Sequence, residues 1–165
     1  STGRKPGFFH MGGQSGPIGF PEQLDTPYTY ETLAPKGLAV GSGAIVVLDD
    51  SVCIVEYIQK VFEFFVHESC GKCTPCRLGT TRILELLTDF VEGRAKDGDV
   101  ERLEYMARQV SQLSACGLGQ SVNVALMSAL RHRRGDFEAH INGGACPAGA
   151  CACHENGRNK ACLTI

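Results

Sequence analysis

Residues 68–79 read Glu68-Ser-Cys-Gly-Lys-Cys-Thr-Pro-Cys-Arg-Leu-Gly79, which places Cys70, Cys73 and Cys76 three residues apart. A cubane iron–sulfur cluster has four irons, and each iron needs one outside ligand. A C-x-x-C-x-x-C loop covers three irons, and a distant cysteine closes the fourth. The stretch therefore predicts a [4Fe–4S] site.

Apolar residues at helical spacing flank this loop on both sides. Before it, the pattern starts at Asp50-Ser51, which we take as N-cap residues; after it, Thr74 is the expected N-cap and Pro75 the first helical residue. The expected helices cover residues 51–68, 75–91, 100–113 and about 121–132. Four helices with short connections predict a mostly α protein built as a four-helix bundle.

The segments on either side of the bundle have a different composition. Residues 1–50 are rich in glycine and proline, with two short strands expected at residues 7–10 and 44–48, typical of the end of a β-grasp-like unit. Residues 142–165 lose periodicity and form a cysteine-rich tail. We therefore divide the chain into a β/loop segment (1–50), an iron–sulfur helical bundle (51–141) and a tail (142–165).

Cys116 is the expected fourth cluster ligand. It lies in a turn of small residues between the third and fourth helices, and an up-and-down bundle can bring that turn next to the cysteine loop. Two alternatives are a zinc knuckle, because zinc also takes four thiolates, and a buried core thiol at Cys116. The third evenly spaced cysteine in the loop favours a cubane.

Composition narrows the function classes. The 165 residues carry 16 lysines and arginines against 18 acidic residues, with no basic block, which argues against nucleic-acid binding. No apolar run has membrane-spanning length and no leader is recognisable, which predicts a soluble, cytoplasmic protein. Nine cysteines clustered as C-x-x-C favour metal ligation over disulfides.

The loop and the later Cys116-Gly-Leu-Gly-Gln120 resemble the cluster-binding domain of the NADH-oxidising flavoprotein subunit of complex I. They also resemble the related subunits of bifurcating NAD-linked hydrogenases and formate dehydrogenases. Residues 12–16 and 38–47 are similar to the end of that subunit's β-grasp insertion. The resemblance implies that Cys70, Cys73, Cys76 and Cys116 hold one [4Fe–4S] cluster, which takes single electrons from an FMN reduced by NADH.

The chain departs from the family in one important respect. It contains no G-x-G-x-x-G, so the resemblance places FMN and NADH on a missing or partner domain, and we assign no catalytic residue. The implied partners are a flavin/NADH-binding domain or subunit, a [2Fe–2S] thioredoxin-like subunit, and a hydrogenase or formate dehydrogenase subunit. The chain is then an electron-transfer part of an NADH-dependent oxidoreductase.

A second set of donors lies near the end of the chain. His140, Cys146 and Cys151 have spacings that a loop can close around zinc, and Cys53 stands at the start of the first helix. In bifurcating hydrogenase relatives the corresponding residues resemble a structural zinc site. The alternatives are a core thiol with a surface histidine, a second cluster, and other zinc ligands, namely Cys153, His154 and Cys162. A zinc-stabilised assembly module without a redox role is the alternative function.

Overall fold

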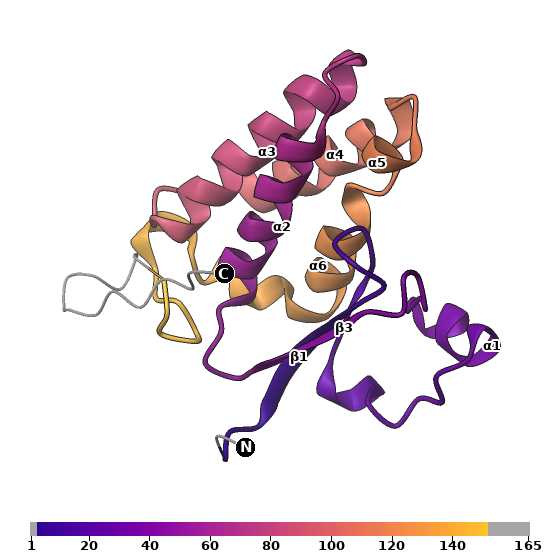
Figure 1. Ribbon diagram of the computed structural model, residues 1–165. Coiled ribbons are helices and arrows are strands. Elements are labelled where there is room, and N and C mark those ends of the chain that lie inside the picture. Colours follow the sequence, from indigo (N-terminus) through magenta and orange to yellow (C-terminus); the bar gives the residue numbers. More distant parts are fainter. Residues whose placement is uncertain (1–2, 152–165) are drawn as a thin grey trace.

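The computed structural model describes residues 3–151, and most of these residues are helical. The four long helices pack as a bundle with a small sheet against it (Figure 1), which confirms the predicted fold class. They are α2 (Ile54–Glu68), α3 (Thr74–Val91), α4 (Asp99–Leu113) and α6 (Asn123–Glu138). Within the described residues, no helix is both long enough and apolar enough to cross a lipid bilayer.

Helix α2 is the central element of the bundle. Its buried stripe, including Val55, Ile58, Phe62 and Phe65, repeats at helical spacing and packs against α3 and α6. The predicted cap at Asp50-Ser51 is wrong, because the helix begins after Cys53, whose extended backbone forms the N-cap. The Asp49 carboxylate instead accepts a hydrogen bond from the Ser51 backbone N–H in the turn before the helix.

Helices α3 and α4 approach closely where α3 carries a glycine. A Cβ atom placed on Gly79 would lie 2.2 Å from Cγ2 of Val110, so only glycine permits this spacing. The N-cap of α3 is Cys73, one residue before the predicted Thr74, and Pro75 lies in the first turn where its missing N–H costs nothing.

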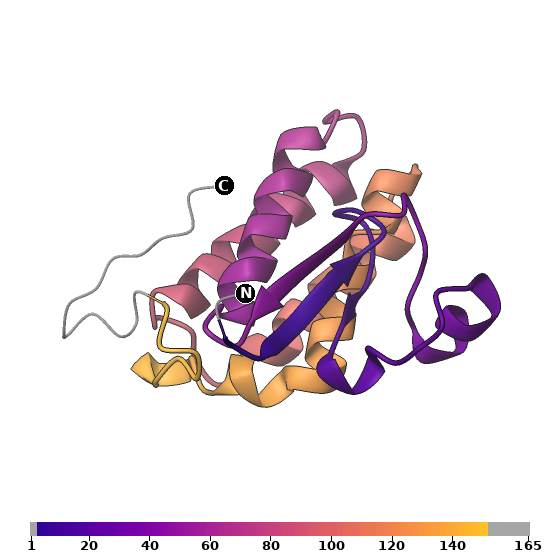
Figure 2. The same ribbon diagram turned by 60° about the horizontal axis from the view of Figure 1, so that its bottom comes forward.

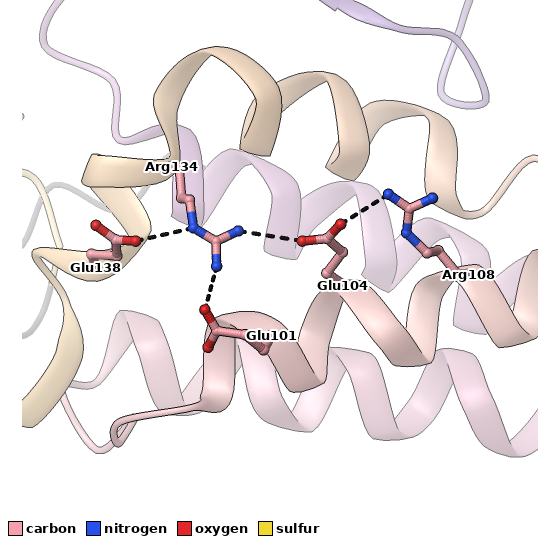
Figure 3. A network of polar contacts seen from close by, with 5 residues as sticks. All are labelled: Glu101, Glu104, Arg108, Arg134 and Glu138. Atoms are coloured by element: carbon pink, nitrogen blue, oxygen red, sulfur yellow. Dashed lines mark hydrogen bonds and ion pairs between the residues drawn. The ribbon is translucent and has the colours of Figure 1, made fainter.

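Helix α6 extends beyond the predicted end at residue 132. Arg133 has non-helical backbone angles (φ −136°, ψ 36°), and the helix continues past this kink to Glu138. Arg134, just after the kink, pairs with Glu101 and with Glu104 (3.3 Å) on α4 and with Glu138 (3.0 Å), as Figure 3 shows. The pairs with Glu101 and Glu104 join α6 to α4, and each of these partly exposed ion pairs contributes about 1 kcal/mol or less.

The sheet has the order β2-β1-β3 and is antiparallel throughout. Its strands are β1 (Pro6–Met11), β2 (Ile18–Gly19) and β3 (Ile45–Asp49), so the two predicted strands are confirmed and β2 was missed because it has only two residues. The short helices are α1 (Tyr30–Leu33) and α5 (Gly117–Gln120), with 3-10 turns at Pro21–Gln23, Ala34–Lys36 and Ile141–Gly143. Figure 2 shows the sheet lying across α2 and α6.

A buried polar contact joins the sheet to the bundle. The Tyr57 hydroxyl on α2 lies 2.9 Å from Nδ1 of His10 on β1, and Nε2 of His10 lies 3.0 Å from the Gly16 carbonyl oxygen. Because a carbonyl only accepts, Nε2 carries the proton and Nδ1 accepts from Tyr57. Burial lowers the pKa of His10, against the opposing effect of the Gly16 bond, so this histidine is held neutral.

Candidate metal centres

The cysteine loop joins α2 to α3 at one end of the bundle. Helix α2 ends at Glu68, and Gly71 adopts a left-handed conformation (φ 74°) that lets the chain turn back toward α3. Cys70 precedes this turn, Cys73 caps α3, and Cys76 lies in the first turn of α3. The exposed amides at the start of α3 favour negative charge at this end, as thiolates provide.

The turn that carries Cys116 packs against the same end of α3. Cys116 is the N-cap of α5, and a Cβ atom placed on Gly119 would lie 3.3 Å from Cβ of Cys76. Figures 1 and 2 show α5 at the same end of the bundle as the α2–α3 connection. The bundle therefore brings together two segments that are forty residues apart in the sequence.

Cys73 lies at the junction of the loop and this turn. Its sulfur accepts hydrogen bonds from the backbone N–H groups of Ala115 and Cys76, which lower the pKa of the Cys73 thiol against the opposing effect of burial. Ala115 directly precedes Cys116, so the loop sulfur and the turn are in contact. Backbone donors of this kind stabilise thiolates bound to iron–sulfur clusters.

The four cysteines differ in exposure. Cys76 is buried, Cys73 is half-buried, and Cys70 and Cys116 are exposed. This arrangement fits a [4Fe–4S] cluster. It offers four thiols and two N–H donors to one sulfur, and it has a glycine where a side chain would fill the space between Ser114 and Cys76. The ligand role of each cysteine stays a prediction that rests on this arrangement.

A different geometry brings together Cys53, His140, Cys146 and Cys151. All four are buried, and their ligand atoms lie within 4.8 Å of one another. Among residues 3–151 this is the one group of histidine, cysteine or acidic side chains close enough together to bind a single metal ion. Nε2 of His140 lies 3.5 Å from Sγ of Cys53 and 3.4 Å from Sγ of Cys151. Three sulfurs and one imidazole are a common donor set for structural zinc.

The imidazole of His140 is oriented by the helix that precedes it. Its Nδ1 lies 2.6 Å from the carbonyl oxygen of Asp136, one turn earlier, so Nδ1 donates and Nε2 faces the sulfurs. Burial lowers the pKa of His140, but hydrogen bonds with Cys146 and Cys53 outweigh it and raise the pKa to about 10. A metal ion here must displace a proton from Nε2, so its binding weakens in acid.

Sequence reasoning named the eight candidate donor residues but missed two groups that lie beside them. The Asp136 carbonyl is one, and the i, i+4 spacing to His140 is the signal that could have revealed it. The other is Ser114, two residues before Cys116, whose burial no pattern in the sequence indicates. The alternative ligands Cys153, His154 and Cys162 lie outside the described residues.

Comparison with known proteins agrees with the iron–sulfur site predicted from the sequence. Residues 56–140 match the family described as the NADH-ubiquinone oxidoreductase-F iron–sulfur binding region. The F subunit of the NADH-quinone oxidoreductase of Streptomyces coelicolor is 37% identical over 151 residues, covering 89% of this chain and 34% of that protein. The NADP-reducing hydrogenase subunit HndC of Solidesulfovibrio fructosivorans is 35% identical over 140 residues, covering 85% of this chain and 29% of that protein.

A solved structure extends the comparison to the fold. A chain of the NAD+-reducing [NiFe]-hydrogenase in the H2-reduced state superposes with a TM-score of 0.74 at 31% identity, covering 84% of this chain and 24% of that one. The chain thus spans about a third of the length of the curated relatives it matches. With the match covering α2, α3, α4 and α6, the chain belongs to the NADH-ubiquinone oxidoreductase-F iron–sulfur binding family.

Proposed function

We propose that this chain is an electron-transfer module that holds one [4Fe–4S] cluster on Cys70, Cys73, Cys76 and Cys116. When bound, the cluster supplies one-electron chemistry between an NADH/FMN site and further iron–sulfur clusters. The observation that carries the proposal is the contact of the cysteine loop with the Cys116 turn, through the Ala115 amide and Gly119.

Two of the proposed cluster ligands are held by the protein, and the other two are exposed to solvent. Cys76 is buried and Cys73 accepts two backbone hydrogen bonds, so this side of the site is fixed by the protein. Cys70 and Cys116 are exposed and form the side that can face a redox partner. An edge open to a partner suits a relay, because the protein then shields one side and exposes the other.

The remaining parts of the reaction belong to other segments or subunits. Without a G-x-G-x-x-G, the described bundle has no sequence signal for a dinucleotide, so NADH and FMN bind on another domain of the same or a partner chain. The other partners are a [2Fe–2S] thioredoxin-like subunit and a hydrogenase or formate dehydrogenase subunit, in the cytoplasm. The two relatives whose names include a hydrogenase support the hydrogenase partner.

Anaerobic purification, or reconstitution with iron and sulfide, tests the proposal. The protein should be brown, contain about four irons per chain and give an S = 1/2 electron paramagnetic resonance (EPR) signal on reduction. A colourless protein that holds zinc alone would contradict it and favour the alternative of an assembly module without a redox role. That alternative has one observation in its favour, the tight buried donor set around His140.

This second set also serves the electron-transfer module. A zinc ion on Cys53, His140, Cys146 and Cys151 would fasten the chain that follows α6 to the start of α2. Structural zinc contributes its binding energy directly to folding. Purified protein should then contain one zinc per chain in addition to iron, and removing that zinc should lower the unfolding temperature.

A further inference from the structure

Ser114 carries a buried hydroxyl whose surroundings point to a role. The residue follows the end of α4, is 6% exposed, and its Oγ is the one buried side-chain oxygen or nitrogen that has no oxygen or nitrogen atom as a hydrogen-bond partner among the described residues. An unsatisfied buried hydroxyl costs about 1–3 kcal/mol. Such a cost indicates that the hydroxyl has a partner in the functional protein.

The backbone of Ser114 is fixed on both sides. Its N–H donates to the Val110 carbonyl oxygen (3.1 Å), and its own carbonyl oxygen accepts from the Gln120 side chain (3.2 Å). These two bonds fix the main chain at Ser114, so the hydroxyl can move only by rotation about the Cα–Cβ bond.

The hydroxyl faces the cysteine site. A Cβ atom placed on Gly119 would lie 2.3 Å from Ser114 Oγ and 3.3 Å from Cβ of Cys76, so both occupy the space that this glycine leaves open. The Ser114 side chain also lies within hydrogen-bonding reach of the Cys73 sulfur, beside the Ala115 and Cys76 amides. The hydroxyl thus lies among two of the proposed cluster ligands.

We propose that the Ser114 hydroxyl donates a hydrogen bond to the cluster at the Cys73 sulfur and raises the reduction potential of the cluster. The inference rests on the proposed function. Reduction adds negative charge to the cluster and its thiolates, and a fixed donor stabilises the more negative state more strongly. Removing the donor therefore makes reduction harder.

The test compares Ser114→Ala with Ser111→Ala in the cluster-loaded protein. Ser111 is the matched control, because its hydroxyl lies in the same region but donates to the Gln120 carbonyl oxygen (2.5 Å) and not to a sulfur. We expect Ser114→Ala to lower the reduction equilibrium constant about tenfold, a fall of about 59 mV for one electron. Ser111→Ala should keep the wild-type potential, measured by EPR-monitored redox titration.

A hydroxyl-retaining variant separates chemistry from packing. Ser114→Thr should keep most of the wild-type potential, and pulsed EPR in D2O should show an exchangeable proton coupled to the reduced cluster in wild type that Ser114→Ala lacks. Equal potentials in Ser114→Ala and wild type, or an equal fall in Ser114→Thr and Ser114→Ala, would overturn the inference. If wild-type protein forms no cluster, the proposed function itself fails.

Discussion

The two sulfur-rich regions of this molecule differ in compactness and in exposure. The donors around His140 lie within 4.8 Å of one another and are all buried. The loop cysteines and Cys116 come from two segments that meet at a helix end, and two of the four are exposed. A single ion needs donors that nearly touch, whereas a cubane keeps its ligands apart because each binds a different iron.

The placement of the two regions along α2 gives each its role. Cys53 caps the start of α2 and Cys70 follows its end, so 15 helical residues, or about 22 Å, lie between them. One end of the helix is fastened by a buried donor set next to the sheet. The other end carries the cysteine loop, whose Cys70 is exposed. Under the proposed function, the structural and redox roles are therefore separated in space.

Substitution of a proposed ligand should give the largest effects, and it tests directly whether the two regions bind different metals. Cys116→Ser removes one of four cluster ligands, so iron should fall from about four per chain to near zero while zinc is retained. Cys146→Ser should do the reverse, losing zinc and keeping iron. Metal analysis of anaerobically prepared proteins measures both quantities.

The account requires that the two substitutions remove different metals. If both substitutions remove the same metal, the chain has one centre and not two. If Cys116→Ser loses only zinc, the loop is a zinc knuckle and the relay proposal is wrong.

Two glycines in α5 allow a sharper test of the open site. A methyl group at Gly119 would lie 2.3 Å from Ser114 Oγ and 2.4 Å from Ser114 Cβ, whereas a methyl at Gly117 meets nothing within 4 Å. Gly119→Ala should cost about 1–3 kcal/mol locally and reduce cluster occupancy several-fold. Gly117→Ala, the matched control, should be neutral or slightly stabilising. Iron content and visible absorbance report the difference.

Zinc content should be the same in both glycine variants, because α5 and the chain that follows α6 lie at opposite ends of the bundle in Figures 1 and 2. Equal cluster occupancy in the two variants would mean that the space at Gly119 has no part in cluster assembly. A fall in zinc would mean that the two centres are coupled through the bundle.

The smallest expected effect is the contribution of His10, which lies outside both centres, to the pH dependence of the free energy of unfolding. Burial lowers the pKa of His10 in the folded protein, so below about pH 6.5 the unfolded chain binds a proton that the folded protein does not. The free energy of unfolding should therefore fall as pH decreases from 6.5 toward the folded pKa. For one proton the slope is at most about 1.4 kcal/mol per pH unit.

His10→Gln should flatten this slope, because it removes the group that gains a proton on unfolding. Denaturant unfolding between pH 5 and 8 measures the slope for wild type and variant. Identical slopes in wild type and His10→Gln would show that acid sensitivity comes from the metal centres and not from the sheet–bundle contact.

Much of this arrangement could be predicted from the sequence, because its strongest signals are local. Helical spacing located the four long helices, and the C-x-x-C-x-x-C run identified the loop. The N-caps were misplaced because Cys53 and Cys73 take the cap position through extended backbone and not through a side-chain bond. Propensity alone favours Ser and Thr at that position.

What the sequence could not reveal depends on tertiary packing. The two-residue strand β2 exists because it pairs with β1, and the kink at Arg133 leaves α6 running past its predicted end. The burial of Ser114 follows from its contact with Gly119, and no period in the sequence encodes that contact. Cys53 was assigned to His140 largely through a family resemblance, since 87 residues separate them.

X-ray absorption at the iron and zinc edges of one anaerobic sample tests the existence of two distinct centres most directly. The account predicts iron with sulfur neighbours and short iron–iron scattering, and zinc with three sulfurs at about 2.3 Å and one nitrogen at about 2.0–2.1 Å. Iron without iron–iron scattering, or zinc bound by four sulfurs and no nitrogen, would contradict it.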